Sequence, residues 1–313
     1  MFEGWPPPVL DPAGPYAWPV TTLSWVLMAM AAAVLGLVLL ALWLALFGGA
    51  RVRLRIGGTR IVWALGIALP IVVLSALLIY GLTLTSHLSD KIRGDELRVR
   101  VTGEMWWWRV AYLDAAGRPQ WYDANELHIP AGQPVVLELE SGDVIHSFWV
   151  PRLSGKLDMI PGRRNLMRIQ ADEPGVYGGQ CAEYCGGPHA LMGFTVIAHD
   201  PETFARLMDA RRMREQGRAP TTTGGGEALF QQAGCAACHR IAGTPANGLA
   251  GPDLTFTGAR RTLGAGILPN NRGTLMGWIG NSQAIKPNNR MPAYPGLSGE
   301  QLQVLAAYLE AQR

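Results

Sequence analysis

Two long apolar stretches near the start of the chain, residues 23–47 and 61–84, contain no charged side chain. At a rise of about 1.5 Å per residue, a helix over either stretch is long enough to cross a bilayer core of about 30 Å. Helices buried in a soluble core seldom run this long without a polar face. The pattern therefore predicts a transmembrane hairpin over residues 23–89, and Pro70 is expected to kink its second helix.

The connection between the two stretches, residues 48–60, contains four arginines and no acidic residue. Short loops rich in arginine stay in the cytoplasm. We therefore expect residues 1–22, and everything beyond residue 89, to lie on the periplasmic or extracellular side. A signal peptide fits the first stretch less well, because neither Lys nor Arg precedes it.

Beyond the hairpin, residues 90–200 contain short runs in which apolar and polar residues alternate, separated by Gly and Pro. This alternation is typical of half-buried strands and predicts an antiparallel sandwich or barrel. Residues 201–226 predict a basic helix, with its arginines on a solvated face, followed by a flexible Thr/Gly linker. Residues 227–313 begin and end with helical spacing and form a separate domain.

Composition and charge narrow the possible classes of protein. The mean hydropathy of +0.11 excludes a disordered chain. A net charge of +3 is too small to indicate a nucleic acid partner, and four cysteines are too few for a disulfide scaffold. Acidic residues predominate in 90–200 and basic residues in 227–313. Opposite charges favour docking of these two domains, and a tether raises their effective concentration.

The first motif with metal chemistry is a loop that concentrates soft ligands: Cys181 and Cys185, then His189 and Met192. Soft sulfur and nitrogen donors favour copper, and this set is typical of electron-transfer sites. A mononuclear blue-copper loop needs one cysteine, whereas two thiolates can bridge two copper ions. Each copper then needs its own imidazole, and His146 supplies the second from between two apparent strands upstream.

Two alternatives for the loop remain. A Cys181–Cys185 disulfide is compatible with an oxidising compartment, but it leaves His189 and Met192 unexplained. A zinc site is less favoured, because thioether ligation is unusual for zinc.

The second motif is Cys235-Ala-Ala-Cys238-His239, the attachment signature of a c-type haem. In such a site the two cysteines add to the haem vinyl groups and the adjacent histidine binds the iron. A thioredoxin-like redox motif is the alternative, but the surrounding sequence lacks its βαβ pattern.

The sixth haem ligand is expected from Met291, which precedes a proline and the closing amphipathic helix. A His/Met pair raises the reduction potential of a haem. Met276 is the rival ligand. Because it lies in an apparent helix before Trp278, we expect it to belong to the core.

The setting of His146, DVIHSFWVP, and the loop C-x-E-x-C-G-x-x-H-x-x-M resemble subunit II of haem-copper cytochrome c oxidases. With the hairpin and the C-terminal haem motif, the resemblance covers the whole chain and is to a caa-type subunit II with a fused cytochrome c domain. It implies a multidomain membrane protein with a two-helix hairpin, a cupredoxin-like domain (90–200) and an all-α cytochrome c domain (227–313).

The resemblance also implies site residues. In a binuclear CuA centre, Cys181 and Cys185 would bridge the two copper ions. One imidazole, from His146 or His189, would bind each copper. Met192 and the Glu183 carbonyl would be weak axial ligands. The Glu183 side chain would point toward a magnesium ion at the interface with subunit I, with Asp158 nearby. Trp106 matches the tryptophan through which family members take electrons from cytochrome c. For Trp107 and Trp108 we expect core packing or a membrane-interface belt.

The implied function is that of the subunit through which electrons enter a respiratory terminal oxidase. Electrons from a cytochrome c or another donor would pass by haem c and CuA to subunit I, where oxygen is reduced to water with proton pumping. Subunits I and III and membrane lipid are the expected partners, with no nucleic acid. The bacterial inner membrane is the expected location.

One position departs from the family pattern. Three residues before Trp63, where the family often has a glutamate near a proton channel, this chain has Arg60. The departure puts that proton route in doubt and leaves a nitric oxide reductase with a CuA subunit as an alternative. A membrane-anchored copper and haem carrier or assembly protein is a second alternative. A quinol oxidase is disfavoured, because such subunits lack the copper ligands.

Overall fold

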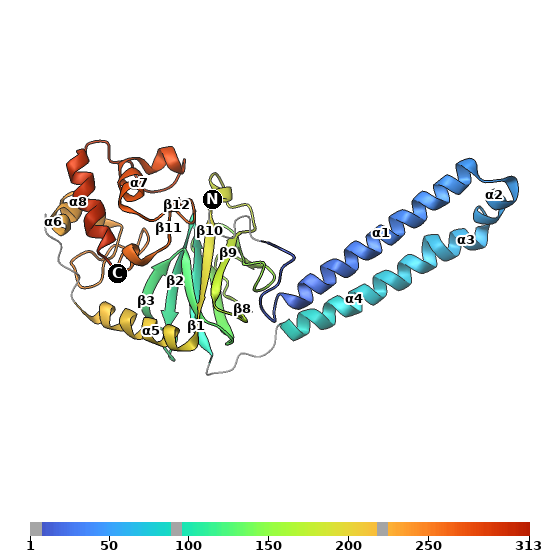
Figure 1. The fold of residues 1–313 in the computed structure, drawn as a ribbon, viewed down its shortest axis with the longest axis horizontal. Coiled ribbons are helices and arrows are strands. Elements are labelled where there is room, and N and C mark those ends of the chain that lie inside the picture. The colour runs from blue at the N-terminus through green and yellow to red at the C-terminus, as the bar shows by residue number, and fades with distance from the viewer. Residues whose placement is uncertain (1–7, 89–95, 218–224) are drawn as a thin grey trace. The chain divides into compact units, whose positions relative to one another are not determined.

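The computed structural model describes residues 8–88, 96–217 and 225–313, and the chain divides into two units (Figure 1). One unit is the helical hairpin that begins at Trp18. The other contains residues 8–17 and the described residues from 96 onward.

The hairpin unit consists of two long apolar helices joined by a short helical turn region. Its elements are α1 (Trp18–Phe47), α2 (Ala50–Ile56), α3 (Thr59–Trp63), the π-helical turn η1 (Ala64–Ala68) and α4 (Leu69–Leu88). Two candidate spans, Trp18–Phe47 and Thr59–Ser86, each reach a mean hydropathy of 2.6 and expose their apolar side chains. Both helices are long and apolar enough to cross a membrane, in agreement with the predicted hairpin.

The hairpin differs from the sequence-based expectation in three places. Helix α1 begins at Trp18 rather than at residue 23. Pro19 fits the first turn of a helix, and the Thr22 hydroxyl donates to the Trp18 carbonyl within it. The expected loop at 48–60 contains α2. Immediately before Pro70 the second helix forms η1. A proline lacks an N–H and crowds the carbonyl four residues earlier, and a wider turn accommodates both effects.

The domain that follows is a sandwich of two five-stranded sheets (Figure 1). The first has the strand order β3-β2-β1-β5-β8, with bounds β1 Leu97–Glu104, β2 Trp107–Leu113, β3 Pro119–Ala124, β5 Val135–Ser141 and β8 Asn165–Ile169. The second has the order β4-β10-β9-β6-β7, with bounds β4 Glu126–Pro130, β6 His146–Trp149, β7 Leu157–Met159, β9 Gly175–Cys181 and β10 Gly193–His199.

The predicted sandwich is therefore confirmed, but its sheets are mixed rather than wholly antiparallel. Each contains one parallel pair, β1 with β5 and β4 with β10, because strands distant in sequence pair side by side. Trp108 lies at the centre of the core with no exposed surface, and its ring packs against Phe148 and Phe194 at centroid distances of 5.8 and 5.7 Å. Its expected role in core packing is confirmed.

Residues before the first helix lie against the sandwich. The Ala13 N–H donates to the Arg152 carbonyl at 2.7 Å, and the Ala13 carbonyl accepts from Asp172 N–H at 2.9 Å. A Cβ at Gly14 would lie 1.9 Å from the Gln170 carbonyl oxygen, so only glycine permits this approach. The N-terminal segment is thus part of the sandwich unit.

Helix α5 (Pro201–Gln216) follows the sandwich and is capped by the Asp200 side chain, which accepts from Thr203 N–H at 2.9 Å. The expectation of a wholly solvated arginine face is wrong. The Arg211 side chain is buried and pairs with Asp123 at 2.9 Å, and Arg214 donates to the Ala242 carbonyl. Arg211 is buried and Arg214 is half-buried, because α5 contacts both domains that it connects. Most of the predicted Thr/Gly linker, residues 218–224, lies outside the described residues.

The C-terminal domain is built mainly from helices around its own apolar core (Figure 1). Its elements are α6 (Gly226–Gln232), the 3₁₀ turns η3 (Cys235–Ala237) and η4 (Thr257–Ala259), strands β11 (Thr262–Leu263) and β12 (Leu268–Pro269), α7 (Arg272–Ile285) and α8 (Gly299–Glu310). The expected all-α domain therefore includes one two-stranded ribbon.

Candidate copper and haem sites

Neighbouring strands of the second sheet position the copper-loop residues. His146 begins β6 and Cys181 ends β9, and Phe148 of β6 pairs with Cys181 in register. The chain then runs through residues 182–192 into β10, so that the loop folds back over His146. The His146 ring lies against Gly103 of β1, where a Cβ would approach within 2.8 Å of the ring carbons. A glycine at this position leaves room for the imidazole.

The loop brings together the side chains that the sequence predicts as copper ligands. The two sulfur atoms of Cys181 and Cys185 are 3.8 Å apart. Nδ1 of His146 lies 3.8 Å from Cys181 Sγ, and Nδ1 of His189 lies 3.4 Å from Cys185 Sγ. Each thiol therefore has its own imidazole neighbour.

The two weaker donors lie beside the same pair of thiols. Met192 Sδ is 3.8 Å from Cys185 Sγ, and the Glu183 carbonyl oxygen is 3.2 Å from Cys181 Sγ. Both cysteines are free and buried. Their separation is far longer than the disulfide bond length of about 2.05 Å, so this geometry does not support the disulfide alternative.

The electrostatics of the thiol pair favour a bound cation. The hydrogen bond with the Cys185 thiol lowers the pKa of Cys181 well below its usual range, and His146 acts in the same direction. The interaction with Cys181 raises the pKa of Cys185. Two adjacent thiolates repel each other, and metal ions remove that repulsion. Two sulfurs, two imidazoles and a thioether form a soft donor set that fits copper.

Asp143 supports the copper set and was not assigned a role from the sequence. Its Oδ1 lies 2.8 Å from Nε2 of His146, which leaves Nδ1 facing the thiols. Its Oδ2 accepts from the Met105 N–H at 2.8 Å. A carboxylate on the far nitrogen of a metal-binding histidine fixes the orientation and tautomer of the ring. Its position three residues before His146 is the sequence signal that could have indicated this role.

Replacing Asp143 with asparagine should weaken copper binding about 10- to 100-fold, because the amide orients His146 less strongly than the carboxylate. The measurement is a copper titration of the purified chain against a competing chelator. Asp114→Asn, in the exposed turn between β2 and β3, is the control. Equal affinities of Asp143→Asn and the parent chain would contradict the role of Asp143.

The structure does not bring Glu183 and Asp158 into a metal-binding group. Within the described residues, the one group of three or more His, Cys or acidic side chains with metal-binding geometry is His146, Cys181 and Cys185. Asp158 lies on β7 opposite Ser147. The magnesium assignment therefore stays a prediction.

The C-terminal domain contains a cavity of about 430 Å³ at the haem motif. Its walls include both motif cysteines, His239 and Met291, together with apolar side chains of the domain core, namely Phe230, Leu254, Leu263, Leu275, Ile279, Leu305 and Leu309. The sequence placed these ligands on opposite sides of a haem, and the fold brings them to one cavity. Met276 is absent from the lining and packs against the core from outside.

The orientation of His239 fits an iron ligand. Nδ1 lies 2.7 Å from the Pro252 carbonyl oxygen, to which it donates, so the lone pair of Nε2 remains for a metal. Burial lowers the pKa of His239, which favours the neutral, ligating form. A Cβ at Gly251 would lie 2.6 Å from the ring, so glycine is needed beneath it.

The segment that bears Met291 is held by side-chain hydrogen bonds. The Met291 N–H donates to Asn289 Oδ1 at 2.8 Å, and its carbonyl accepts from Gln283 Nε2 at 2.7 Å. Cavity, cysteines and ligand pair together fit a covalently attached haem.

Comparison with known proteins agrees with both sites. Residues 120–199 match the family model described as cytochrome C oxidase subunit II, periplasmic domain, and residues 225–312 match the cytochrome c model. Cytochrome c oxidase subunit 2 of Alkalihalophilus pseudofirmus is 34% identical over 96% of this chain and 90% of its own length. The chain belongs to the cytochrome c oxidase subunit 2 family.

A second curated relative agrees with this assignment. Subunit 2 of Bacillus subtilis is 31% identical over 80% of this chain and 73% of its own length. Among solved structures, the periplasmic domain of subunit II (CoxB) of Bradyrhizobium japonicum is 29% identical and covers 39% of this chain and 97% of its own, with a TM-score of 0.34. The two family models show that this subunit II carries a fused cytochrome c domain. Its curated relatives are subunits of cytochrome c oxidase, an oxidoreductase complex. The two domains imply copper and haem c.

In this subunit II, Trp106 connects the two sites. Its indole Nε1 donates to the Cys185 carbonyl at 2.9 Å, and its ring lines the haem cavity. Gly186 makes the contact possible, because it has a φ of +107° and a Cβ there would lie 3.2 Å from the Trp106 ring. Trp107 also lines the cavity, a position that the expectation of core packing or a membrane belt did not include.

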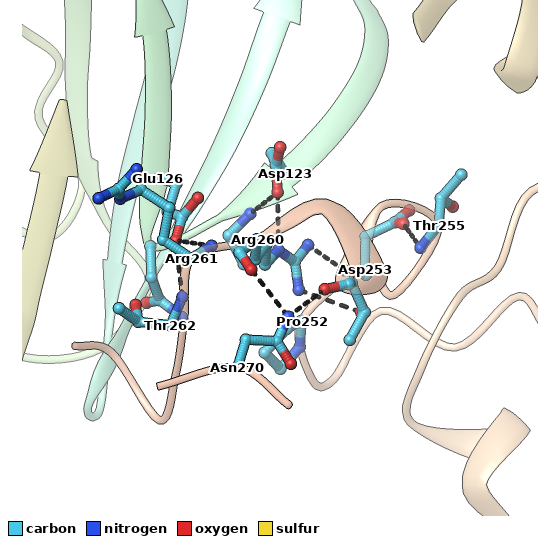
Figure 2. Close-up of polar contacts among 12 residues, drawn as sticks. Asp123, Glu126, Pro252, Asp253, Thr255, Arg260, Arg261, Thr262 and Asn270 are labelled. Carbon is cyan, nitrogen blue, oxygen red and sulfur yellow. Dashed lines mark hydrogen bonds and ion pairs between the residues drawn. The ribbon is translucent and has the colours of Figure 1, made fainter. Parts of the chain in front are cut away.

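A buried polar network joins the copper and cytochrome domains (Figure 2). Asp123 at the end of β3 accepts from Arg260 Nε at 2.8 Å while also pairing with Arg211. Glu126 on β4 accepts from the N–H groups of Arg261 and Thr262 at 2.7 and 3.0 Å. Opposite charges were expected to favour docking, but these partners lie far apart in sequence and no local pattern indicates them.

The network should make stability depend on pH through Glu126. Burial raises the pKa of Glu126 from 4.5 to about 7, and the nearby Asp123 adds to this shift. Between these values the folded chain keeps a proton that the unfolded chain releases, so stability falls as pH rises through this window. Glu126→Gln stays neutral, and its thermal stability relative to the parent should rise over that range, by on the order of 3 kcal/mol at most.

The measurement is thermal unfolding of both chains across this pH range. Glu202→Gln, on the exposed start of α5, should reproduce the parent profile. A constant stability difference between the Glu126→Gln chain and the parent at all pH values would refute the role of Glu126.

Proposed function

We propose that this chain is the subunit through which electrons enter a caa-type terminal oxidase. Electrons from a cytochrome c or another respiratory donor would reach a haem c attached to Cys235 and Cys238. They would pass to a binuclear CuA centre on the loop at Cys181 and Cys185, and then to subunit I, where oxygen is reduced to water with proton pumping. The observation that carries the proposal is Trp106, whose ring lines the haem cavity while its indole donates to Cys185.

The residues of each site fit one-electron transfer. When bound, the copper pair and the haem would each accept and release single electrons. The copper donors come from a rigid strand pair and a hydrogen-bonded loop, which limits their movement when the charge changes. His239 and Met291 would hold the haem iron, and a His/Met pair would give the haem the raised potential that an acceptor from respiratory donors needs.

Contacts of the N-terminal segment support the proposed membrane arrangement. Residues 8–17 bond to the copper domain, which supports the proposal that both lie on one side of the membrane. The arginine-rich turn between the spans indicates the cytoplasmic side, so we place the soluble domains in the periplasm or outside a bacterial cell. Subunits I and III are the proposed partners. A magnesium ion near Glu183 would lie at the interface with subunit I.

The experiment is spectroscopy and turnover of the membrane complex purified through this chain. We expect a mixed-valence dinuclear copper signal, a c-type haem spectrum, a copurifying haem-copper subunit and oxygen consumption with reduced cytochrome c. Absence of the dinuclear signal would overturn the copper assignment. Turnover with nitric oxide instead of oxygen would support the reductase alternative that Arg60 leaves open, and isolation of the chain alone would support a carrier or assembly protein.

A further inference from the structure

Lys286, directly after α7, has an unusual position for a lysine. Only 3% of its surface is exposed. Its Nζ donates to three main-chain oxygens, those of Trp106 at 2.7 Å, Leu191 at 2.8 Å and Gly264 at 2.9 Å. All three donors of the ammonium are therefore used. Two of the acceptors belong to the copper domain and one to the cytochrome domain.

This arrangement makes Lys286 a directional contact rather than an ion pair. In the described part of the chain, no carboxylate lies within ion-pair distance of Lys286. A buried charged group is tolerated only when hydrogen bonds replace its hydration. The acceptors from the copper domain are available only when the two domains are in contact, so this burial ties Lys286 to one docked geometry.

The two acceptors in the copper domain belong to the segments that form the copper site. Trp106 donates to the Cys185 carbonyl, and Leu191 immediately precedes Met192. One ammonium group therefore holds both the tryptophan beside the haem cavity and the end of the copper loop.

On the cytochrome side, Lys286 is tied to the methionine expected to bind the haem iron. The Lys286 carbonyl accepts from Asn289 Nδ2 at 2.7 Å, and Asn289 Oδ1 accepts from the Met291 N–H at 2.8 Å. A short chain of hydrogen bonds thus runs from Met291 through Asn289 and Lys286 to Trp106 and the copper loop.

Two further contacts surround this point. Gly193 N–H donates to the Ala265 carbonyl at 2.9 Å, and Arg290 pairs with Asp143 at 3.2 Å. Of the two basic side chains at this point, Lys286 is buried, whereas the Arg290 side chain is 57% exposed. The two domains are therefore docked in one arrangement. A Thr/Gly linker alone would leave them free to move and to meet only by collision.

We propose that Lys286 is a positioning residue for electron transfer. It holds the Met291 segment against Trp106 and the copper loop, so that the haem and copper sites exchange electrons while the two domains stay docked. The inference rests on the proposed function, because it assumes that both sites carry their cofactors. Lys286 touches neither cofactor and acts through the main chain of Trp106 and Leu191.

The test uses Lys286→Met in the complete oxidase, with Arg272→Met as the matched control. Arg272 lies in the same domain and pairs only at the surface with Glu310, 2.9 Å away. Burial lowers the pKa of Lys286 to about 7. The measurements are therefore made at about pH 6, where the ammonium form with three donors predominates.

The first readout is the rate at which the haem c passes an electron to the copper site after rapid photoreduction. If the docked fraction falls to a tenth, the rate falls about tenfold. The parent and Arg272→Met should transfer at the same rate at all salt concentrations. Lys286→Met should be slower, with a rate that depends on salt, because opposite charges must then bring the domains together.

The second readout needs no turnover. Hydrogen exchange of the Gly193 amide, which donates across the interface, should speed up in Lys286→Met while amides inside the β1–β2 pair keep their protection. Because a merely structural defect would release both sets of amides, the pattern separates a positioning role from general destabilisation.

The outcomes are distinct from those that test the proposed function. If the parent complex lacks the dinuclear copper or haem c signal, the proposed function fails. If both signals are present and Lys286→Met matches the parent in rate, salt dependence and Gly193 exchange, the positioning role is overturned. Should Lys286→Met not assemble, Lys286→Gln, with two donors, takes its place. An intermediate rate would support the role, and an unchanged rate would overturn it.

Discussion

Cys185→Ser should abolish the dinuclear copper signal and lower turnover of the oxidase with an external donor by more than about 100-fold. Cys185 Sγ lies 3.8 Å from Cys181 Sγ, 3.4 Å from His189 Nδ1 and 3.8 Å from Met192 Sδ. The substitution therefore removes the sulfur atom that lies next to all three of these donors. Loss of groups that only support metal ligands already costs about 10- to 100-fold, and loss of a bridging ligand should cost more.

Electron paramagnetic resonance and oxygen uptake measure these two effects on the same preparation. Met167→Leu on β8, a volume-conserving change in the same domain, should keep both signal and turnover. The c-type haem spectrum should persist in Cys185→Ser, because its cysteines are in another domain. A retained mixed-valence signal in Cys185→Ser would show that this thiol does not bridge two coppers.

Asp123→Asn should destabilise the contact between the copper and cytochrome domains by about 3–5 kcal/mol. The Asp123 carboxylate is 1% exposed and pairs with Arg211 at 2.9 Å and Arg260 at 2.8 Å, both of which are buried (Figure 2). Burial opposes ionisation of Asp123, but the two guanidinium groups outweigh it and lower its pKa. A neutral amide would leave two buried positive charges facing each other.

Denaturant unfolding of the full chain and hydrogen exchange at the Arg261 and Thr262 amides measure the loss. Asp209→Asn, which removes an exposed pair with Arg212 on the same α5, should change stability by about 1 kcal/mol or less. If both variants lost the same small amount, Asp123 would have no special part in holding the domains together.

The features that the sequence predicts correctly are those encoded within a few consecutive residues. The apolar spans need only a count of uncharged positions, and the copper loop contains four side-chain donors within residues 181–192. The haem motif is equally local. His146 could be included because it lies upstream of the loop in the run DVIHSFWVP, although the structure places it at the start of β6 rather than between two strands.

The errors and omissions share a different cause. Arg211 and Arg206 look alike on a helical pattern, yet the first is buried against Asp123 and the second is exposed beside Glu202. Which arginine is buried depends on the surface against which α5 packs. Asp123, the partner of Arg211 on that surface, is 88 residues away in the sequence. The Lys286 contact with Trp106 spans 180 residues, and no periodicity relates the two.

Asp143 contacts both the copper site and the cytochrome domain. It bonds to His146 and also pairs with Arg290 of the cytochrome domain. If bound copper changes the free energy of the Asp143–Arg290 ion pair, then formation of that pair changes the free energy of copper binding by the same amount, because linkage is reciprocal. Metal loading and domain assembly are therefore thermodynamically coupled through one carboxylate, and the order in which the chain acquires copper and closes its domains cannot alter their combined free energy.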